Sequence, residues 1–227
     1  MPVVNVTPPA KEPITVDQAA WHIREDNDEL LTTDKIEMAI QAVREMCENA
    51  TRRAFITQKW RAVLDEFPRP SMNLSSSTWY GPQWGTVPGP LVIMRPDGTT
   101  GYEIYLPFPR LQAVTLLSYV DVNGVVQNMN VSTDLLVDSV SEPARILPAY
   151  GTVWPTTREQ ANAVIIEWTC GYGDDPEDVP ACARQWMLAN IGTCYELRES
   201  NVIMTRGTIQ VPPYIDRLLD PIRVVRY

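Results

Sequence analysis

The spacing of apolar residues changes at residue 58, and this change constrains the fold more than any other feature of the sequence. In the segment TTDKIEMAIQAVREMCENATRR the apolar residues recur every three or four positions, at Ile36, Ala39, Ile40, Val43, Met46, Cys47 and Ala50. This spacing predicts a helix with one apolar face. From Gln58 the segment QKWRAVLDEF alternates instead, with Trp60, Ala62 and Leu64 on one side, which predicts a strand. The apolar face of the helix and that of the strand must each pack against other elements, so we expect an α+β fold.

Further helices are predicted on both sides of the β-forming region. In TVDQAAWHI, Thr15 followed three residues later by Gln18 is the pattern of a capping box, so a helix is expected to begin there. The longer helix that follows is expected to be capped by Thr32 or Thr33. Pro180 is suited to the first turn of a third helix, VPACARQWMLANIGTCYELRES, and VPPYIDRLLDPIRVVRY predicts a short helix followed by an arginine-bearing tail.

Alternating segments between these helices predict the strands. They are AVTLLSYVD, VVQNM, DLLVDSV, ARILPAY and ANAVIIEWTCGY, with a hairpin turn at Asn123-Gly124. We expect them to form one compact antiparallel sheet. Three tryptophans are assigned to the core: Trp60, Trp168 and Trp186.

The order of these segments predicts a helical bundle, built from the N- and C-terminal helices, with an inserted antiparallel β-sheet segment. The expected parts are an extended N-terminal arm (1–13), the bundle (14–57 and 179–200), the β segment (58–178) with a long loop (71–101), and a C-terminal short helix and tail (201–227).

Charge and composition exclude several classes of function. The 227 residues include 19 Lys and Arg against 28 Asp and Glu, a net charge of -9, which is the wrong sign for general binding to nucleic acid. No apolar stretch approaches the roughly 20 residues of a membrane span, and the N-terminus lacks the pattern of a signal peptide. We therefore expect a soluble protein. The four cysteines are widely scattered, which favours buried free thiols over disulfides or a zinc site.

Few residues point to catalysis, a metal or a cofactor, and none of these is expected. The one histidine, His22, lies on a predicted helix face and is interpreted as structural. The stretch GYGDDPEDVP contains four carboxylates, but Pro176 interrupts the spacing of a calcium loop. The favoured interpretation is a hinge, in which Gly171 and Gly173 turn the chain out of the sheet and the acidic residues precede a helix N-terminus. Two alternative functions of the whole chain stay open. One is a hydrolase that uses paired carboxylates on a polymer, and the other is an independent cytosolic ligand-binding module.

Three peripheral segments have little means of folding alone, and we expect them to order against neighbouring chains. They are the proline-rich arm, the aromatic loop and the C-terminal tail. Residues 201–227 contain four arginines and two aspartates, a charge of +2 against -11 for the rest. The candidate interface residues are Trp79, Tyr80, Trp84, Arg217, Arg223, Arg226 and Tyr227. Alternatively, the aromatic residues cover their own sheet and the tail is a solvated terminus.

The order of several segments resembles the head-tail connector (adaptor) proteins of tailed bacteriophages. They are a helix ending in ATRRAFITQKW, the LPFPRLQAVTLLSYVDVNG strand region, the GYGDDPEDVP step into a helix and YELRE at the end of that helix. The resemblance spans nearly the whole chain, but most of residues 71–101 is an insertion relative to the family.

The resemblance implies a structural virion protein without enzyme activity. It implies a ring, commonly of twelve subunits, that docks beneath the portal protein, extends the DNA channel and presents a surface to a stopper or tail-completion protein. Genomic DNA would pass through the lumen without specific binding. The place of action would be the virion neck, after synthesis in the cytoplasm of a bacterial host, with no membrane involved.

Overall fold

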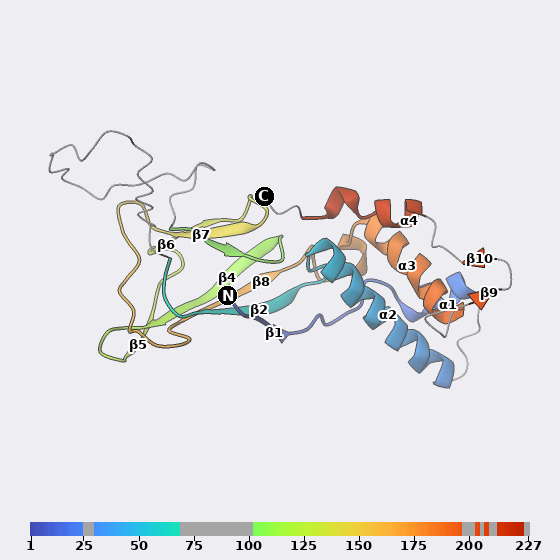
Figure 1. Ribbon diagram of the computed structural model, residues 1–227, viewed down its shortest axis with the longest axis horizontal. Helices are drawn as coiled ribbons and strands as arrows, with labels where there is room; N and C mark the ends of the chain where they lie inside the picture. Colours follow the sequence, from blue (N-terminus) through green and yellow to red (C-terminus); the bar gives the residue numbers. More distant parts are fainter. Residues whose placement is uncertain (25–29, 69–101, 197–202, 205–206, 209–212, 225–227) are drawn as a thin grey trace. The chain divides into compact units, whose positions relative to one another are not determined.

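The computed structural model describes residues 1–24, 30–68, 102–196, 203–204, 207–208 and 213–224. Along the chain, the helices are α1 (Val16–Ile23), α2 (Leu30–Thr51), α3 (Ala181–Glu196) and α4 (Pro213–Arg217), with short 3-10 turns η1 (Pro176–Asp178) and η2 (Asp220–Ile222) (Figure 1). The strands are β1 (Val3–Thr7), β2 (Gln58–Leu64), β3 (Ile104–Leu106), β4 (Leu111–Val120), β5 (Val126–Asn128), β6 (Leu135–Asp138), β7 (Ala144–Pro148), β8 (Val164–Cys170), β9 (Ile203–Met204) and β10 (Gly207–Thr208).

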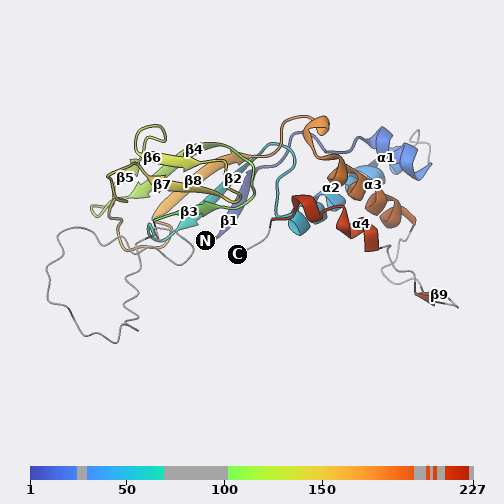
Figure 2. The same ribbon diagram turned by 90° about the horizontal axis from the view of Figure 1, so that it is seen from above.

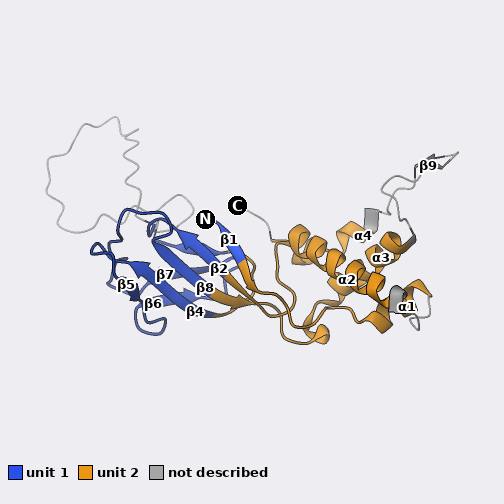
Figure 3. Ribbon diagram, turned by 90° about the horizontal axis from the view of Figure 1, so that it is seen from below, with its two compact units in different colours: residues 1–4, 61–106, 114–167 blue, residues 5–60, 107–113, 168–227 orange. Residues whose placement is uncertain are grey.

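These elements belong to two compact units (Figure 3). Unit 1 comprises residues 1–4, 61–106 and 114–167 and contains most of the β structure. Unit 2 comprises residues 5–60, 107–113 and 168–227 and contains the helices. The chain is therefore α+β, as the change in apolar spacing predicts.

Helix α1 begins with the predicted capping box. The Gln18 backbone N–H donates to Thr15 Oγ1, and the Thr15 backbone N–H donates to Gln18 Oε1, both at 3.2 Å. These bonds satisfy two backbone donors at the helix start. The helix ends at Arg24, whose φ of 58° is left-handed.

Helix α2 starts earlier than predicted. The expected cap at Thr32 or Thr33 is wrong, because the helix already begins at Leu30. Leu30 and Leu31 are strong helix formers, and they extend the helix upstream of the threonines. Downstream, the predicted apolar face is buried at Ile36, Ile40, Val43 and Cys47.

Unit 2 has one apolar core to which all four helices contribute. The core combines Ala19 and Ala20 of α1 with the buried face of α2, and α3 adds Ala183, Trp186, Met187 and Ile191. The C-terminal segment completes it with Ile215, Leu219 and Ile222. In Figure 2, α2, α3 and α4 lie side by side.

The strands form separate sheets, so the prediction of one compact sheet is wrong. The first sheet has five strands in the order β1-β2-β8-β4-β5, and the second has the order β3-β7-β6. Strands β9 and β10 form a short antiparallel pair. In the second sheet Leu136 is opposite Leu147 and Tyr105 is opposite Arg145. Strands with one apolar face need a facing layer, and a second sheet supplies it.

Unit 1 contains a cluster of aromatic side chains. The Phe67 ring stacks on Trp154 with centroids 4.7 Å apart and meets the edge of Tyr119 at 5.7 Å. The Trp154 indole N–H donates to the Tyr102 carbonyl at 2.7 Å, so its polar group is satisfied.

Two of the three tryptophans assigned to the core are buried as predicted, namely Trp168 and Trp186. Trp60 is only half-buried and stacks on Phe108, with centroids 4.1 Å apart.

All four cysteines are free thiols, as predicted. Cys47 and Cys170 are buried, and burial raises the pKa of the Cys170 thiol to about 12. Cys194 is exposed, so the prediction of buried thiols does not hold there. Within the described ranges, no helix combines the length and the apolar character needed to cross a bilayer.

Candidate assembly surfaces

Only two of the sequence-predicted interface residues fall within the described structure. Arg217 is the last residue of α4 and is exposed. Arg223 follows η2, and its guanidinium lies 3.6 Å from the Asp220 carboxylate in an exposed ion pair. The other five lie outside the described residues: Trp79, Tyr80, Trp84, Arg226 and Tyr227.

The C-terminal segment is fastened to unit 2 as far as Val224. The Arg53 guanidinium, which is buried, donates to the carbonyl of Ile222. The Val224 backbone N–H donates to the carbonyl of Thr51 at 3.1 Å. The predicted short helix is present as α4, and contacts of the arginine-bearing tail with neighbouring chains stay a prediction.

The N-terminal arm is also bound by its own chain. Strand β1 is the neighbour of β2 in the five-stranded sheet. The Asn5 amide donates to Gln58 Oε1 at 2.8 Å, and the Val63 backbone N–H donates to the Pro2 carbonyl at 3.2 Å. These residues therefore have partners within their own chain, and contacts of the arm with neighbouring chains stay a prediction.

Residues further along the arm make ion pairs within unit 2. Lys11 Nζ lies 2.5 Å from the Asp175 carboxylate, and Glu12 accepts from Arg44 Nε at 2.8 Å. The arm is extended, as its prolines predict, and it is attached at several points.

A buried polar network lies beneath the arm. Arg44 donates to Glu48 Oε2 at 2.8 Å, and Glu48 Oε1 accepts from the Phe55 backbone N–H at 3.2 Å and from the Gln58 amide at 2.5 Å. Burial raises the pKa of Glu48, and Arg44 and these donors oppose the rise. Because a buried charge needs partners, the network fixes the end of α2 to the start of β2.

The acidic stretch between β8 and α3 forms a connection between sheet and helix. Gly171 has a φ of +143°, and a Cβ atom there would lie 2.7 Å from the Thr57 backbone nitrogen, so this position requires glycine. The Asp178 carboxylate accepts from the Asp175 backbone N–H at 3.3 Å, and η1 leads into α3. These contacts agree with the hinge interpretation. No group of three or more metal-ligating side chains occurs in the part of the chain that the structure describes.

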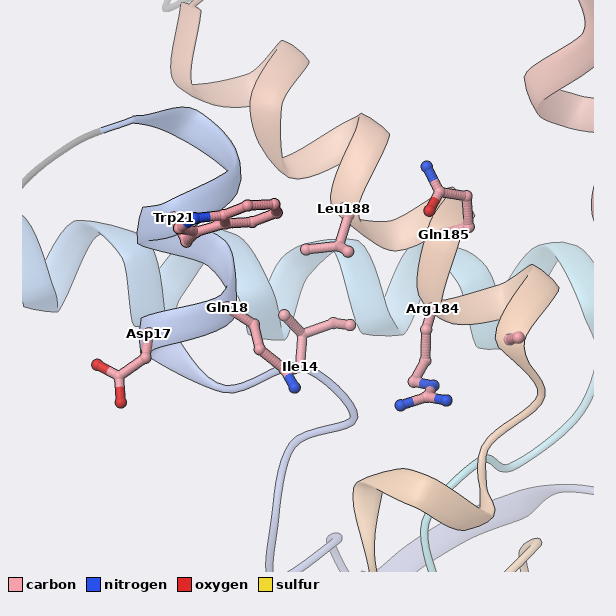
Figure 4. Close-up of a pocket in the computed structure, with 8 residues that line it drawn as sticks. Ile14, Asp17, Gln18, Trp21, Arg184, Gln185 and Leu188 are labelled. Atoms are coloured by element: carbon pink, nitrogen blue, oxygen red, sulfur yellow. The ribbon is translucent and has the colours of Figure 1, made fainter.

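A groove between α1 and α3 contains an exposed tryptophan that sequence reasoning missed. The groove has a volume of about 490 Å³ and is lined by Ile14, Trp21, Arg184 and Leu188, among others. Trp21 is 84% exposed, and Figure 4 shows its ring facing Leu188. The Nε atom of Arg184 is buried and has no hydrogen-bond partner among the described residues. Exposed aromatic side chains beside an arginine are typical of protein interfaces.

The sequence contains a signal for this position of Trp21. Val16, Ala19, Ala20 and Ile23 define the apolar face of α1, and at 100° per residue Trp21 falls outside that face. A large apolar residue on the polar side of an amphipathic helix indicates a contact beyond the helix's own core.

No family model matches the sequence, and no curated protein does either. Solved structures are similar in fold. A chain of the neck of an empty gene transfer agent (GTA) particle, computed with C6 symmetry, matches with a TM-score of 0.71 and 18% identity over 100% of this chain and 97% of that one. The chain has the fold of a gene transfer agent neck chain.

Two further structures share this neck fold at the same coverage. They are the virion of the native gene transfer agent, with a TM-score of 0.69 and 17% identity, and the neck of the native particle computed with C12 symmetry, with 0.62 and 19%. At these identities the likeness concerns the fold. It is consistent with the resemblance to head-tail connector proteins found in the sequence.

Proposed function

We propose that the chain is a structural virion protein, a head-tail connector (adaptor) subunit in the neck of a phage-like particle. The observation that carries this proposal is the likeness over the full chain to chains of gene transfer agent necks. The resemblance of the sequence to phage connector proteins supports the same function independently of the structure. No enzymatic activity and no cofactor is part of the proposal.

The proposed assembly is a ring of twelve subunits beneath the portal protein. Support comes from the symmetry of the similar structures, whose necks were computed with C6 and C12 symmetry. The ring would extend the DNA channel and present a surface to a stopper or tail-completion protein. The net charge of -9 is compatible with DNA that slides through the lumen without specific binding.

The interface residues proposed from the sequence remain candidates in this assembly. Arg217 and Arg223 are exposed on the anchored C-terminal segment, and Arg226 and Tyr227 are the last two residues of the sequence. With Trp79, Tyr80 and Trp84, they would contact neighbouring subunits or the portal. The groove beside Trp21 adds a further candidate surface.

We also propose that the fold is a helical bundle with an inserted β segment. In support, α1 and α2 precede strands β2 to β8 in the chain, whereas α3 and α4 follow them. Residues of all four helices share one apolar core.

The test is co-sedimentation with the cognate portal protein. The full chain is expected to bind portal as a ring, whereas a chain that ends at Val224 should bind more weakly. The truncated chain keeps the hydrogen bond between Val224 and Thr51, so the unfolding midpoint of the truncated chain should match that of the full chain. A full chain that stays separate from portal at every concentration would contradict the proposal.

A further inference from the structure

Strand β1 buries little of its own side-chain surface. It lies at one end of the five-stranded order, so one of its edges has no other described strand beside it. Four of its five residues are exposed, including Val4 at 58% and Val6 at 40%. Contacts that bury so little apolar surface open easily.

After residue 10 the arm is attached to unit 2. Lys11 and Glu12 are held by Asp175 and Arg44, and Ile14 is buried in the helical core. Pro8 and Pro9 lie between these anchors and β1, and they keep this part extended. A segment of ten extended residues reaches up to about 35 Å from its anchor.

We propose that in the assembled ring β1 leaves the β2 strand of its own chain and pairs with β2 of a neighbouring copy. This inference rests on the ring assembly proposed above. The edge of β2 in the neighbouring copy already fits β1, because the contacts that β1 makes with β2 of its own chain can form in the same way between two copies. Gln58 would accept from Asn5 of the next copy, and the Val63 N–H would donate to its Pro2 carbonyl, as they do within the chain. Exchange of identical elements is a low-cost route to assembly.

The exposed valines give the exchange a driving force. Within one chain Val4 and Val6 remain in water, whereas a strand that bridges two copies lies at their boundary, where such side chains become covered. A ring also holds the neighbouring β2 edge at a high effective concentration, which offsets the entropic advantage of pairing within one chain. The opposing possibility is that Pro2 and Pro8 only protect an exposed sheet edge.

Disulfide trapping distinguishes the two arrangements. We would introduce Pro2→Cys with Val63→Cys into a Cys194→Ser background, because residues 2 and 63 are joined by a backbone hydrogen bond of 3.2 Å. The matched control is Asp134→Cys with Ala149→Cys, because residues 134 and 149 are likewise joined by a backbone hydrogen bond, of 2.9 Å, away from the exchanging strand. Rings isolated with portal are oxidised, denatured and separated on non-reducing gels.

Exchange predicts a ladder of linked chains for the first pair and single chains for the control pair. In the free monomer, both pairs are expected to link within one chain. If Pro2→Cys with Val63→Cys does not fold, Asn5→Cys with Gln58→Cys, whose parent side chains are hydrogen-bonded, serves the same purpose. Rings that form normally but yield only single linked chains would overturn the exchange and leave the connector function intact. If no ring forms for the unmodified chain, the proposed function is contradicted, and the exchange with it.

Discussion

Glu48 is a carboxylate buried between α2 and the start of β2, and its titration is coupled to folding. Burial raises its pKa above the ordinary value of 4.5, although Arg44 and backbone and amide donors oppose this rise. A raised native pKa gives a contribution to stability that is fully present below 4.5 and is lost as the pH rises through the native pKa.

We predict that Glu48→Gln reduces the gain in unfolding free energy that accompanies a fall in pH from 7 towards 5. Glutamine keeps the size and one of the two accepting oxygens, and it does not titrate. Urea unfolding at the two pH values measures the effect, and Glu45→Gln, on an exposed part of the same helix, is the control. Identical pH dependence in Glu48→Gln and the unmodified chain would show that Glu48 does not titrate with folding.

Asp138 holds the turn between β6 and β7. Its carboxylate accepts from the Ser141 hydroxyl at 2.7 Å, from Arg145 Nε at 2.8 Å and from the backbone N–H of Val140 at 3.1 Å. These donors hold the pKa of Asp138 far below its ordinary value of 3.8. Its stabilising contribution is therefore present above 3.8 and is lost as the pH falls through the lower native pKa.

Replacing Asp138 with asparagine should reduce the unfolding free energy by about 1 to 2 kcal/mol at pH 7, because charged hydrogen bonds are lost in a partly exposed site. Chemical unfolding at pH 7 provides the measurement. Asp174→Asn, at an exposed position in the loop after β8, should change little. An unaltered midpoint for Asp138→Asn would refute this role.

At the scale of elements, two tryptophans on adjacent helices are expected to behave in opposite ways. Trp186 on α3 is 5% exposed and belongs to the helical core, so Trp186→Ala should cost about 3 to 5 kcal/mol of stability. Trp21 on α1 is 84% exposed, so Trp21→Ala should change stability by less than about 0.5 kcal/mol. Thermal unfolding followed by circular dichroism compares them, and a larger loss for Trp21→Ala would contradict the structure.

Sequence reasoning predicts elements well where their signals are local. The capping box of α1, the buried face of α2 and the alternation of β2, β4 and β8 all depend on neighbouring residues. The division into two sheets depends on pairing between distant segments, as the 106 positions between Arg61 and Glu167 illustrate. Spacing of apolar residues carries no information about which strand lies beside which.

The same limit applies to the candidate surfaces. The exposure of Trp21 follows from the pattern of α1, whereas the attachment of Val224 to Thr51 and of Glu12 to Arg44 joins segments that no sequence signal connects. For this reason the sequence predicts partners in neighbouring chains for the arm and the tail but does not predict these intrachain contacts.

At the scale of the whole molecule, the central claim is that this chain works as a subunit of a particle neck. The most direct measurement is an electron cryomicroscopy reconstruction of the neck of particles that contain the chain, at a resolution that allows the fold to be traced. We predict a closed ring of this fold beneath the portal, surrounding the DNA channel. A reconstructed neck without this fold, in particles that assemble and attach tails normally, would contradict it.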